Sequence, residues 1–518
     1  MKSVHWIVAS AVVIGVILRV WTLDDRTMHT DEAVHAVKFG ALLEHGEYRY
    51  DEKEYHGPLL NYLTLVPAWI LGRGSLGEID ERMLRSIPAF FGILLIPLPL
   101  LLRGLKNQAT TIVLALTALS PAMVFYSRYY IQEILLVFFT FGLIISLHYL
   151  VTTSRAIWAA AVGISGGLMH ATKETSIIAF LVIGASGLII WLIRKIEGRA
   201  MHSIRPLHLV IAVFVGCGVS AVFYSSFFTH WTGVLDSFRT YITYFERASN
   251  GAHLHSWYYY LHILLGWQVK GGIVWSEGAI VLFGIVGMIV SFRRFDGAKD
   301  GGDLQRFLAL YTLLMFLVYS AIPYKTPWSI LGGLHGMIVM AGVGIAHLMR
   351  YVERMRFRWI APIGLVIILG HLGAQAYSAG FIYQESPENP YVYAQSTKDV
   401  QRLAAMVELL VTGSPANISV QIVCTGDDYW PLPWYLRRLS RVGWWNSFTD
   451  VFVCTPVILV SPDLEPELLK RLYETPSPGQ RKLYVPVSEK TFMLRPGKEI
   501  RAYATLDLMN AVGISERE

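Results

Sequence analysis

Reactive side chains occur in short clusters that interrupt a largely apolar chain of 518 residues. The first cluster, MHTDEAVHA, contains Asp31 and Glu32, with His35 four positions after Asp31. Residues four apart share one face of a helix, so Asp31 and His35 suit general-base chemistry or a shared metal ion. The competing interpretation is structural, because Thr30 can cap a helix whose first-turn acids complement the positive end of its dipole.

Histidines in two further clusters are candidate ligands of a divalent metal. His56 opens the HGP of EYHGPLLNY, and His253 and His255 have an H-x-H spacing in AHLHSWYYYLH. Alternate residues of a strand share a face, so H-x-H can present two imidazole nitrogens to one ion. We therefore take His56 and His255 as the metal candidates. The alternative is that Asp31, Glu32 and His255 hold a lipid phosphate and an acceptor without a metal.

Three cations lie where apolar runs meet polar loops. They are Arg128 in SRYYIQE, Lys173 in HATKETS and Lys325 in PYKTPW. A solvated side chain is the structural interpretation of each one. As a set they favour a function, because ionisable groups at such depth usually face a cavity or a charged ligand, here a phosphate. The candidates for binding lipid phosphate and substrate are Arg128, Glu133, Lys173, Lys325, Trp257 and Tyr258, although the last two also fit an interfacial aromatic belt.

The apolar runs between these clusters are long enough to cross a bilayer, which takes about 17–25 residues. Charged residues make up only 16% of the chain, below the roughly one quarter of a typical soluble protein. The predicted fold is a polytopic α-helical membrane protein with about eleven spans and a C-terminal extracytoplasmic α/β domain. The spans are expected at 4–23, 86–103, 108–126, 132–152, 156–170, 175–194, 206–228, 277–292, 307–323, 328–349 and 359–378.

The loops between these spans are of two chemical kinds. Short arginine-rich loops such as RGLKNQ and RKIEGRAMHSIR belong in the cytoplasm, so the loops 24–85 and 229–276 and everything after 378 lie outside. We expect a multi-pass protein of the plasma (inner) membrane with a cytoplasmic N-terminus. Every reactive cluster then falls on the outer face. The net charge of +6 arises from the inner loops and does not indicate nucleic-acid binding.

The first outer loop belongs to the transmembrane domain, residues 1–378, and is expected to contain two interfacial helices. The stretch 31–45 is amphipathic, with Val34, Val37 and Ala41 on one face. The stretch 57–72 is apolar but short for a span and begins at a proline.

The second domain, residues 389–518, is expected to be an α/β domain. Strand-like stretches are ISVQIVC, VFVC, VILV, KLYVPV and TFMLRP, and helical stretches are 397–411, 431–441 and 464–474. If ISVQIVC and VILV are parallel, Cys424 and Cys454 lie at opposite ends of the sheet. That separation is too great for a disulfide.

The order of these clusters resembles that of the GT-C glycosyltransferases. The motifs that carry the resemblance are DE after the first span, HGPLL before the second, SRYYIQE, the lysine of ATKE, HSWYYYL and PYKTPW. They are similar to the dolichyl-phosphate-mannose–protein mannosyltransferase and aminoarabinose-transferase superfamily, glycosyltransferase family 39. Within it, the likeness is greatest to the subfamily named "flippase activity-associated". It covers most of residues 1–378, and DDYWPLPWYL extends it into the tail.

The resemblance implies a sugar carried on a polyprenyl monophosphate and transferred, with inversion, to a hydroxyl acceptor on protein, glycan or lipid at the extracytoplasmic face. It further implies that Asp31 is the base with Glu32 beside it, that Arg128 contacts the phosphate, and that His255 matches the metal-contacting histidine of the aminoarabinose branch. One departure concerns the metal. Where many relatives have an acid or a lysine before paired prolines, this chain has His56, in HGP.

Three other functions fit parts of the sequence. A lipid-linked-sugar flippase or transporter would place polar groups near the bilayer midplane in repeated helices, but these spans carry almost no midplane charge. An oligosaccharyltransferase is suggested by GWWNSF, in which Asn446 stands where the acid of that family's WWD motif should be. A non-catalytic partner of a neighbouring enzyme would show no turnover with a polyprenyl-phosphate sugar.

Overall fold

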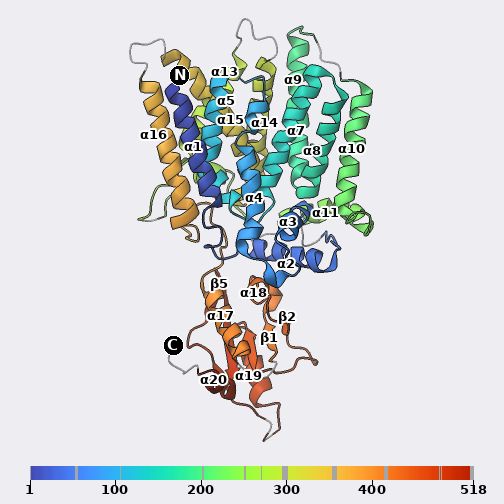
Figure 1. The fold of residues 1–518 in the computed structure, drawn as a ribbon, viewed down its shortest axis with the longest axis vertical. Coiled ribbons are helices and arrows are strands. Elements are labelled where there is room, and N and C mark those ends of the chain that lie inside the picture. The colour runs from blue at the N-terminus through green and yellow to red at the C-terminus, as the bar shows by residue number, and fades with distance from the viewer. Residues whose placement is uncertain are drawn as a thin grey trace. The chain divides into compact units, whose positions relative to one another are not determined.

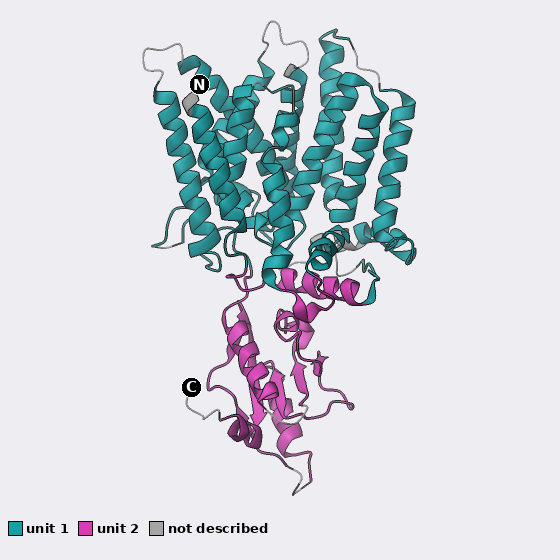
Figure 2. Ribbon diagram, viewed as in Figure 1, with its two compact units in different colours: residues 1–23, 45–71, 80–393 teal, residues 24–44, 72–79, 394–518 magenta. Residues whose placement is uncertain are grey.

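The computed structural model describes residues 2–52, 56–105, 107–200, 204–249, 253–269, 271–293, 301–352, 359–413, 418–477, 479 and 481–513. Parts of the predicted inner loops, such as 294–300 and 353–358, lie outside this set. The chain divides into two compact units, shown in Figure 2. Unit 1 comprises residues 1–23, 45–71 and 80–393, and unit 2 comprises residues 24–44, 72–79 and 394–518.

Unit 1 is a bundle of apolar helices (Figure 1). Among the described residues, seven helices are long and apolar enough to cross a membrane, and a pair bent by 56° adds an eighth. Three shorter apolar helices coincide with the remaining predicted spans. The helices at the predicted spans are α1 (Lys2–Val20), α4 (Glu81–Leu95), the bent pair α5 (Asn107–Leu119) and α6 (Pro121–Ser127), α7 (Glu133–Thr153), α8 (Ala156–Thr172), α9 (Ser176–Ile196), α10 (Pro206–Tyr224), α13 (Gly278–Phe292), α14 (Gly301–Ala321), α15 (Leu331–Val352) and α16 (Ile360–Tyr377).

The break between α5 and α6 follows from the residues at their junction. Pro121 has no N–H to continue the ladder of α5, and the hydroxyl of Ser120 accepts a hydrogen bond from the N–H of Met123 to start α6. Helices α3 (Leu59–Ile70) and α11 (Thr232–Ser249) lie at the lower end of the bundle in Figure 1, opposite the N-terminus. Helix α3 begins directly after Pro58, as predicted from the sequence.

Unit 2 contains a six-stranded mixed sheet. The strand order is β2-β1-β3-β6-β4, and β5 also pairs with β6. The strands predicted in ISVQIVC, VILV, KLYVPV and TFMLRP are present, whereas the VFVC stretch forms no strand and leads irregularly into β3. Strands β2 and β6 were not predicted. The strands are β1 (Val420–Val423), β2 (Val442–Trp445), β3 (Val457–Val460), β4 (Tyr484–Pro486), β5 (Phe492–Arg495) and β6 (Lys498–Thr505).

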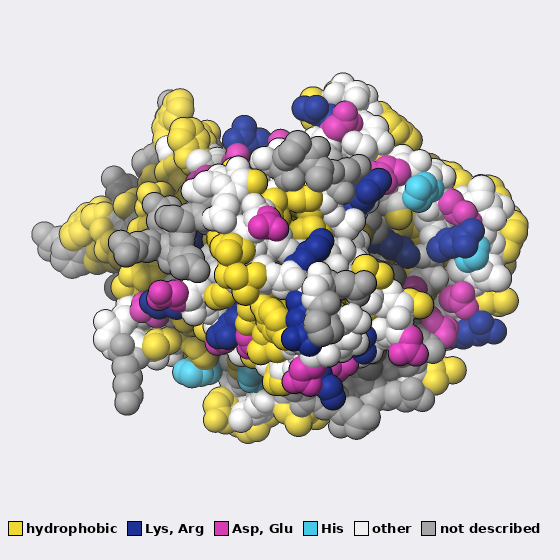
Figure 3. Space-filling model, turned by 90° about the horizontal axis from the view of Figure 1, so that it is seen from below, with side chains coloured by type: hydrophobic (Ala, Val, Ile, Leu, Met, Phe, Trp, Pro, Cys, Tyr) yellow, Lys and Arg dark blue, Asp and Glu magenta, His cyan; other side chains and the backbone are white. Residues whose placement is uncertain are grey.

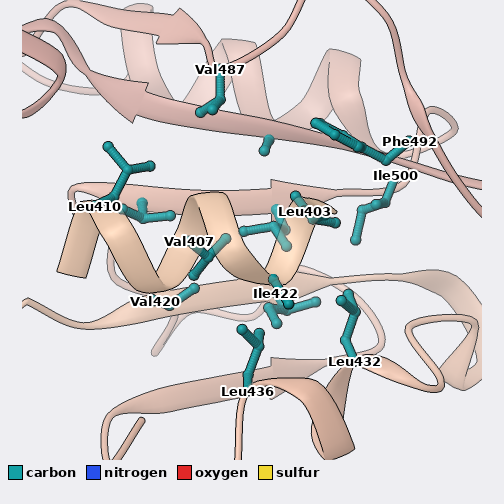
Figure 4. Close-up of a cluster of buried hydrophobic side chains, with 14 of the residues drawn as sticks. Leu403, Val407, Leu410, Val420, Ile422, Leu432, Leu436, Val487, Phe492 and Ile500 are labelled. Carbon is teal, nitrogen blue, oxygen red and sulfur yellow. The ribbon is translucent and has the colours of Figure 1, made fainter. Parts of the chain in front are cut away.

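The core of this sheet domain lies between β1 and helix α17 (Asp399–Thr412), as Figure 4 shows. Leu403, Val407 and Leu410 recur at helical spacing and pack toward Val420 and Ile422 of β1. Three further α-helices belong to the C-terminal part of the unit: α18 (Leu432–Tyr435), α19 (Glu465–Tyr473) and α20 (Leu506–Val512).

The parallel pairing of β1 with β3 is confirmed. Cys424 follows the end of β1 and Cys454 precedes the start of β3, so the two thiols lie at opposite ends of these strands. Both are free, as is Cys217. The geometry explains why no disulfide joins them.

Basic residues pair with acids where the structure describes the predicted inner loops. Arg194 and Arg199 contact Asp303, and Arg306 contacts Glu197 at 3.1 Å. These pairs join α9 to α14. Figure 3 views the molecule from below, away from these loops, and on that face too Lys and Arg side chains are interspersed with Asp and Glu.

Candidate functional site

Helix α2 (Thr30–His45), in unit 2, begins at a reciprocal cap. The Nδ1 atom of His29 accepts a hydrogen bond from the N–H of Asp31 at 3.1 Å. In return, Glu32 accepts one from the N–H of His29 at 3.0 Å and another from Arg26 at 2.9 Å. His29 therefore supplies the cap that the sequence suggested for Thr30, and Glu32 completes it from the third helical position.

The two acids at this helix start have different environments. Glu32 is fully buried and forms the ion pair with Arg26. The side chain of Asp31 is 43% exposed and lies 3.9 Å from Nδ1 of His29. Asp31 is thus the accessible carboxylate of the predicted pair, whereas Glu32 fixes the start of the helix on which Asp31 sits.

In unit 1, three of the predicted motifs meet through two buried ion pairs. Lys173 of ATKETS donates to Glu133 of SRYYIQE at 2.5 Å. The adjacent residue, Glu174, pairs with His56 of the HGP motif at 2.8 Å. The structure therefore brings His56, Glu133 and Lys173 together, although 117 positions separate the first from the last.

Glu174 was not among the predicted site residues. Burial alone would raise the pKa of its carboxyl group, but the His56 ring and the Lys173 ammonium outweigh burial and hold this pKa at about 2. Glu174 is therefore ionised throughout the neutral range. An acid directly after the lysine in a motif between two apolar runs was the available sequence signal.

A small cavity of about 30 Å³ lies beside the Glu133–Lys173 pair. Tyr319 and Trp328 also line it, and Trp328 belongs to the predicted PYKTPW motif. The ring of Trp328 lies 5.8 Å from that of Tyr393. The rings of Trp328 and Tyr393 therefore connect the Glu133–Lys173 pair to the segment that contains His253.

The H-x-H segment forms a short antiparallel bridge with the PYKTPW segment. Leu254 pairs with Tyr324, which places His253 and His255 on the same side of the chain, as predicted. Both imidazole rings contact Tyr393, at centroid distances of 5.3 and 6.4 Å. The Nδ1 atom of His253 is hydrogen-bonded to the hydroxyl of Tyr393.

Lys325 holds this bridge together. Its ammonium is buried and donates to the carbonyl oxygens of His255, at 3.1 Å, and of Ile322. Burial lowers the pKa of Lys325. Burial also lowers the pKa of His255, and the nearby His253 and Lys325 lower it further. His255 is therefore neutral at neutral pH and can serve as a hydrogen-bond acceptor.

The predicted metal ligands do not form a metal centre. Within the described residues, no group of three or more His, Cys, Asp or Glu side chains is arranged to hold an ion. His56 is engaged by Glu174, and His255 stacks on Tyr259 at a centroid distance of 4.2 Å. The residues present therefore do not fit the divalent ion that the sequence suggested for His56 and His255.

Arg128 binds backbone carbonyl groups at the end of α1. Its two terminal nitrogens donate to the carbonyls of Leu18, Trp21 and Thr22 at 2.6–3.0 Å. Its guanidinium carbon lies 4.3 Å from the ring centroid of Phe381. Arg128 thus stabilises the negative end of the α1 dipole, a role that the sequence-based phosphate assignment did not include.

Replacing Arg128 by alanine is expected to lower the melting temperature in detergent, because each hydrogen bond to a charged donor contributes about 1.5–3 kcal/mol. Arg128→Lys should restore only part of the loss, since one ammonium cannot reproduce the planar fork of donors. An Arg128→Ala protein that melts like wild type but binds donor poorly would instead support the phosphate-binding role.

Trp257 and Tyr258 are the most exposed of the predicted site residues, at 66% and 51%. Their rings are 5.8 Å apart and nearly perpendicular. Neither side chain is enclosed by the ion pairs or the histidine segment. Their exposure fits an interfacial position as well as contact with a substrate.

A large apolar cavity of about 990 Å³ runs between α7, α8, α9 and α10. It extends along α9 from Phe180 to Arg194, which corresponds to about 21 Å of helix. Gly184 and Gly187 of α9 line it, and a Cβ at either position would meet open space. The cavity therefore offers a continuous hydrocarbon-like surface within the bundle. His170, three positions before Lys173, lines it as well.

Glu277 is a second buried acid that sequence reasoning missed. Its carboxylate accepts hydrogen bonds from Ser120 at 2.6 Å, from the N–H of Ala122 at 3.1 Å and from Tyr391 at 2.8 Å. The carboxylate fixes the start of α6, whose C-cap residue is Arg128. The signal was an acid at the entrance of an apolar run, in WSEGAIV.

Comparison with known proteins finds one family that resembles part of the sequence and solved structures that resemble the fold. Residues 9–231 match the sequence model of the family described as dolichyl-phosphate-mannose-protein mannosyltransferase. The whole fold is similar to that of ArnT from Cupriavidus metallidurans in the apo state, with a TM-score of 0.63 and 14% identity over 97% of this chain and 98% of that one. The sequence match covers less than half of this chain, and at 14% identity the likeness to ArnT is a likeness in fold.

A second structure of ArnT, bound to undecaprenyl phosphate, is similar with a TM-score of 0.62 and 15% identity over 96% of this chain and 97% of that one. No curated protein sequence matches the chain. The likeness in fold confirms the predicted architecture of a polytopic helical domain followed by a C-terminal mixed-sheet domain.

Proposed function

We propose that the protein is a membrane glycosyltransferase that moves a sugar from polyprenyl monophosphate to an acceptor hydroxyl at the extracytoplasmic face of the plasma membrane, inverting the anomeric centre. The convergence of His56, Glu133, Lys173 and Glu174 in one bundle that also contains a 990 Å³ apolar cavity carries this proposal. The cavity suits a long hydrocarbon chain, and the buried ammonium of Lys173 suits its phosphate.

In the proposed reaction, the acceptor oxygen bonds to the anomeric carbon while the bond to the phosphate oxygen breaks on the opposite side. The acceptor proton passes to the carboxylate of Asp31, the exposed acid at the start of α2. Polyprenyl phosphate departs with the electron pair of the broken bond, and Lys173 offsets its charge. Glu133 holds the Lys173 ammonium in place. A phosphate needs no strong acid to leave.

Purified protein with a labelled polyprenyl-phosphate sugar tests this function. Release of polyprenyl phosphate together with a glycosylated hydroxyl compound is the expected result. A flippase is the competing function, favoured by the long apolar cavity and by the resemblance to the "flippase activity-associated" subfamily. Movement of labelled lipid across proteoliposomes with no release of polyprenyl phosphate would establish the flippase and overturn the transferase.

Filling the apolar cavity with larger side chains is expected to weaken the binding of donors with a long hydrocarbon chain more than that of donors with a short one. Gly184→Leu and Gly187→Leu should raise KM for a long-chain donor about tenfold, because each buried CH₂ contributes about 0.8 kcal/mol, and leave KM for a short-chain analogue unchanged. Gly370→Leu on α16 is the matched control, since Gly370 also faces open space but does not line the cavity. Equal effects on both donors would show that the lipid chain lies elsewhere.

A further inference from the structure

The C-terminal segment DDYWPLPWYLRR bonds directly to the chain that precedes Asp31. The hydroxyl of Tyr435 accepts a hydrogen bond from the N–H of Met28 at 2.8 Å. Gln395 donates to the carbonyl of Thr27, also at 2.8 Å. Thr27 and Met28 are completely buried, so their backbone is fixed by these bonds rather than by water.

Arg495 adds a third attachment one residue before Asp31. Its guanidinium donates to the hydroxyl of Thr30 at 3.4 Å and to the carbonyl of Trp430 at 3.0 Å. The other nitrogen of its fork donates to Asp428 at 2.8 Å, and Lys498 donates to the second oxygen of Asp428 at 2.6 Å. Asp428 thus orients Arg495, which in turn bonds the first residue of α2.

The same segment also holds the other part of the first outer loop in unit 2. Arg437 donates to the carbonyl of Ile79 at 2.8 Å and lies over the ring of Trp434 at 3.7 Å. Arg438 donates to the carbonyl of Gly77 at 3.3 Å. Domain packing alone would need only apolar contacts. Hydrogen bonds to several backbone groups of one segment also fix the position and direction of that segment.

We propose that Tyr435 and Arg495 are positioning residues that set the direction of the Asp31 carboxylate. This rests on the assignment of Asp31 as the base. The C-terminal domain then takes part in catalysis by holding residues 27–30 rigid, and a displacement of about 1 Å at the base costs up to about 100-fold in rate.

Tyr435→Phe and Arg495→Met test this role. Each should lower kcat by roughly 10- to 100-fold with the donor KM unchanged. Arg495→Met leaves Asp428 paired with Lys498, so the domain retains its fold. Two variants are matched controls. Tyr473→Phe removes the hydrogen bonds between Tyr473 and the backbone of Tyr484. Arg471→Met removes the hydrogen bonds from Arg471 to Glu467 and to the carbonyl of Thr449. These contacts involve no residue of the first outer loop, so both controls should retain wild-type kcat.

A double-variant cycle with Asp31→Asn separates positioning from general loss of structure. If Tyr435 acts through Asp31, adding Tyr435→Phe to Asp31→Asn should lower the residual rate no further. Additive losses, or losses equal to those of the control variants, would overturn the positioning role while leaving Asp31 as the base. A fully active Asp31→Asn protein would overturn the proposed base itself.

Discussion

Replacing Asp31 by asparagine is expected to lower the rate of sugar transfer by about 10²–10⁴-fold while the protein stays folded. The substitution preserves the shape of the side chain and removes the group that accepts the acceptor proton. The side chain of Asp31 is 43% exposed, and its contact with Nδ1 of His29 is long, at 3.9 Å. The measurement is kcat together with the melting temperature in the same detergent.

Glu32→Gln is the matched comparison, because it makes the same chemical change at the next residue. Removing the charge of Glu32 breaks its buried ion pair with Arg26, and breaking a buried pair by removing one partner costs about 3–5 kcal/mol. Glu32→Gln should therefore lower the melting temperature markedly. Asp31→Asn should not. The reverse pattern, with Asp31→Asn active and Glu32→Gln stable but inactive, would move the base to Glu32.

Replacing Lys173 by methionine is expected to reduce both stability and activity. Glu133 would be left as a buried carboxylate without its partner, at a cost of about 3–5 kcal/mol. The donor phosphate would also lose the charge that stabilises its departure. The double variant Glu133→Gln, Lys173→Met removes both charges and should recover most of the stability but not the activity. Thermal unfolding and kcat/KM separate the two effects.

Arg306→Met is the control for that experiment. It also removes a cation from a carboxylate, that of Glu197, but at the other end of α9 from Lys173. It should cost stability without changing kcat/KM once the protein is folded. If the double variant at Glu133 and Lys173 regains both stability and activity, the ion pair only stabilises the bundle, and the phosphate is bound by other groups.

The sequence predicted the elements of this fold well, because its strongest signals are local. The apolar runs of spanning length and the helix start after Pro58 are each encoded by neighbouring residues. The observed helices lie at these predicted positions. Strand β6 was missed because its charged residues, such as Lys498 and Arg501, hide the apolar alternation, although it pairs with β3, β4 and β5.

The site was predicted only in part, because the partner of a charged side chain is set by tertiary structure. Residue types and motif order pointed to His56, Glu133 and Lys173, which the structure brings together. The same reasoning could not show that Arg128 bonds carbonyl groups about a hundred positions earlier, or that Glu32 belongs to a cap. An isolated cation at a span boundary has the same sequence signature in either role.

The DDYWPLPWYLRR motif shows the same limit. From sequence alone it fits an acidic turn leading into a helix. Its hydrogen bonds to residues 28 and 79 join positions more than 350 apart, and no local pattern encodes such contacts.

An experimental structure with a polyprenyl-phosphate sugar bound tests the central claim most directly, through the distances from the donor to Asp31 and Lys173. We expect the donor phosphate within hydrogen-bond reach of Lys173, with the Asp31 carboxylate across the anomeric carbon and about 2.6–3.2 Å from the position of the acceptor oxygen. A donor bound so that the Asp31 carboxylate cannot reach the acceptor oxygen, either directly or through one water, would contradict this assignment.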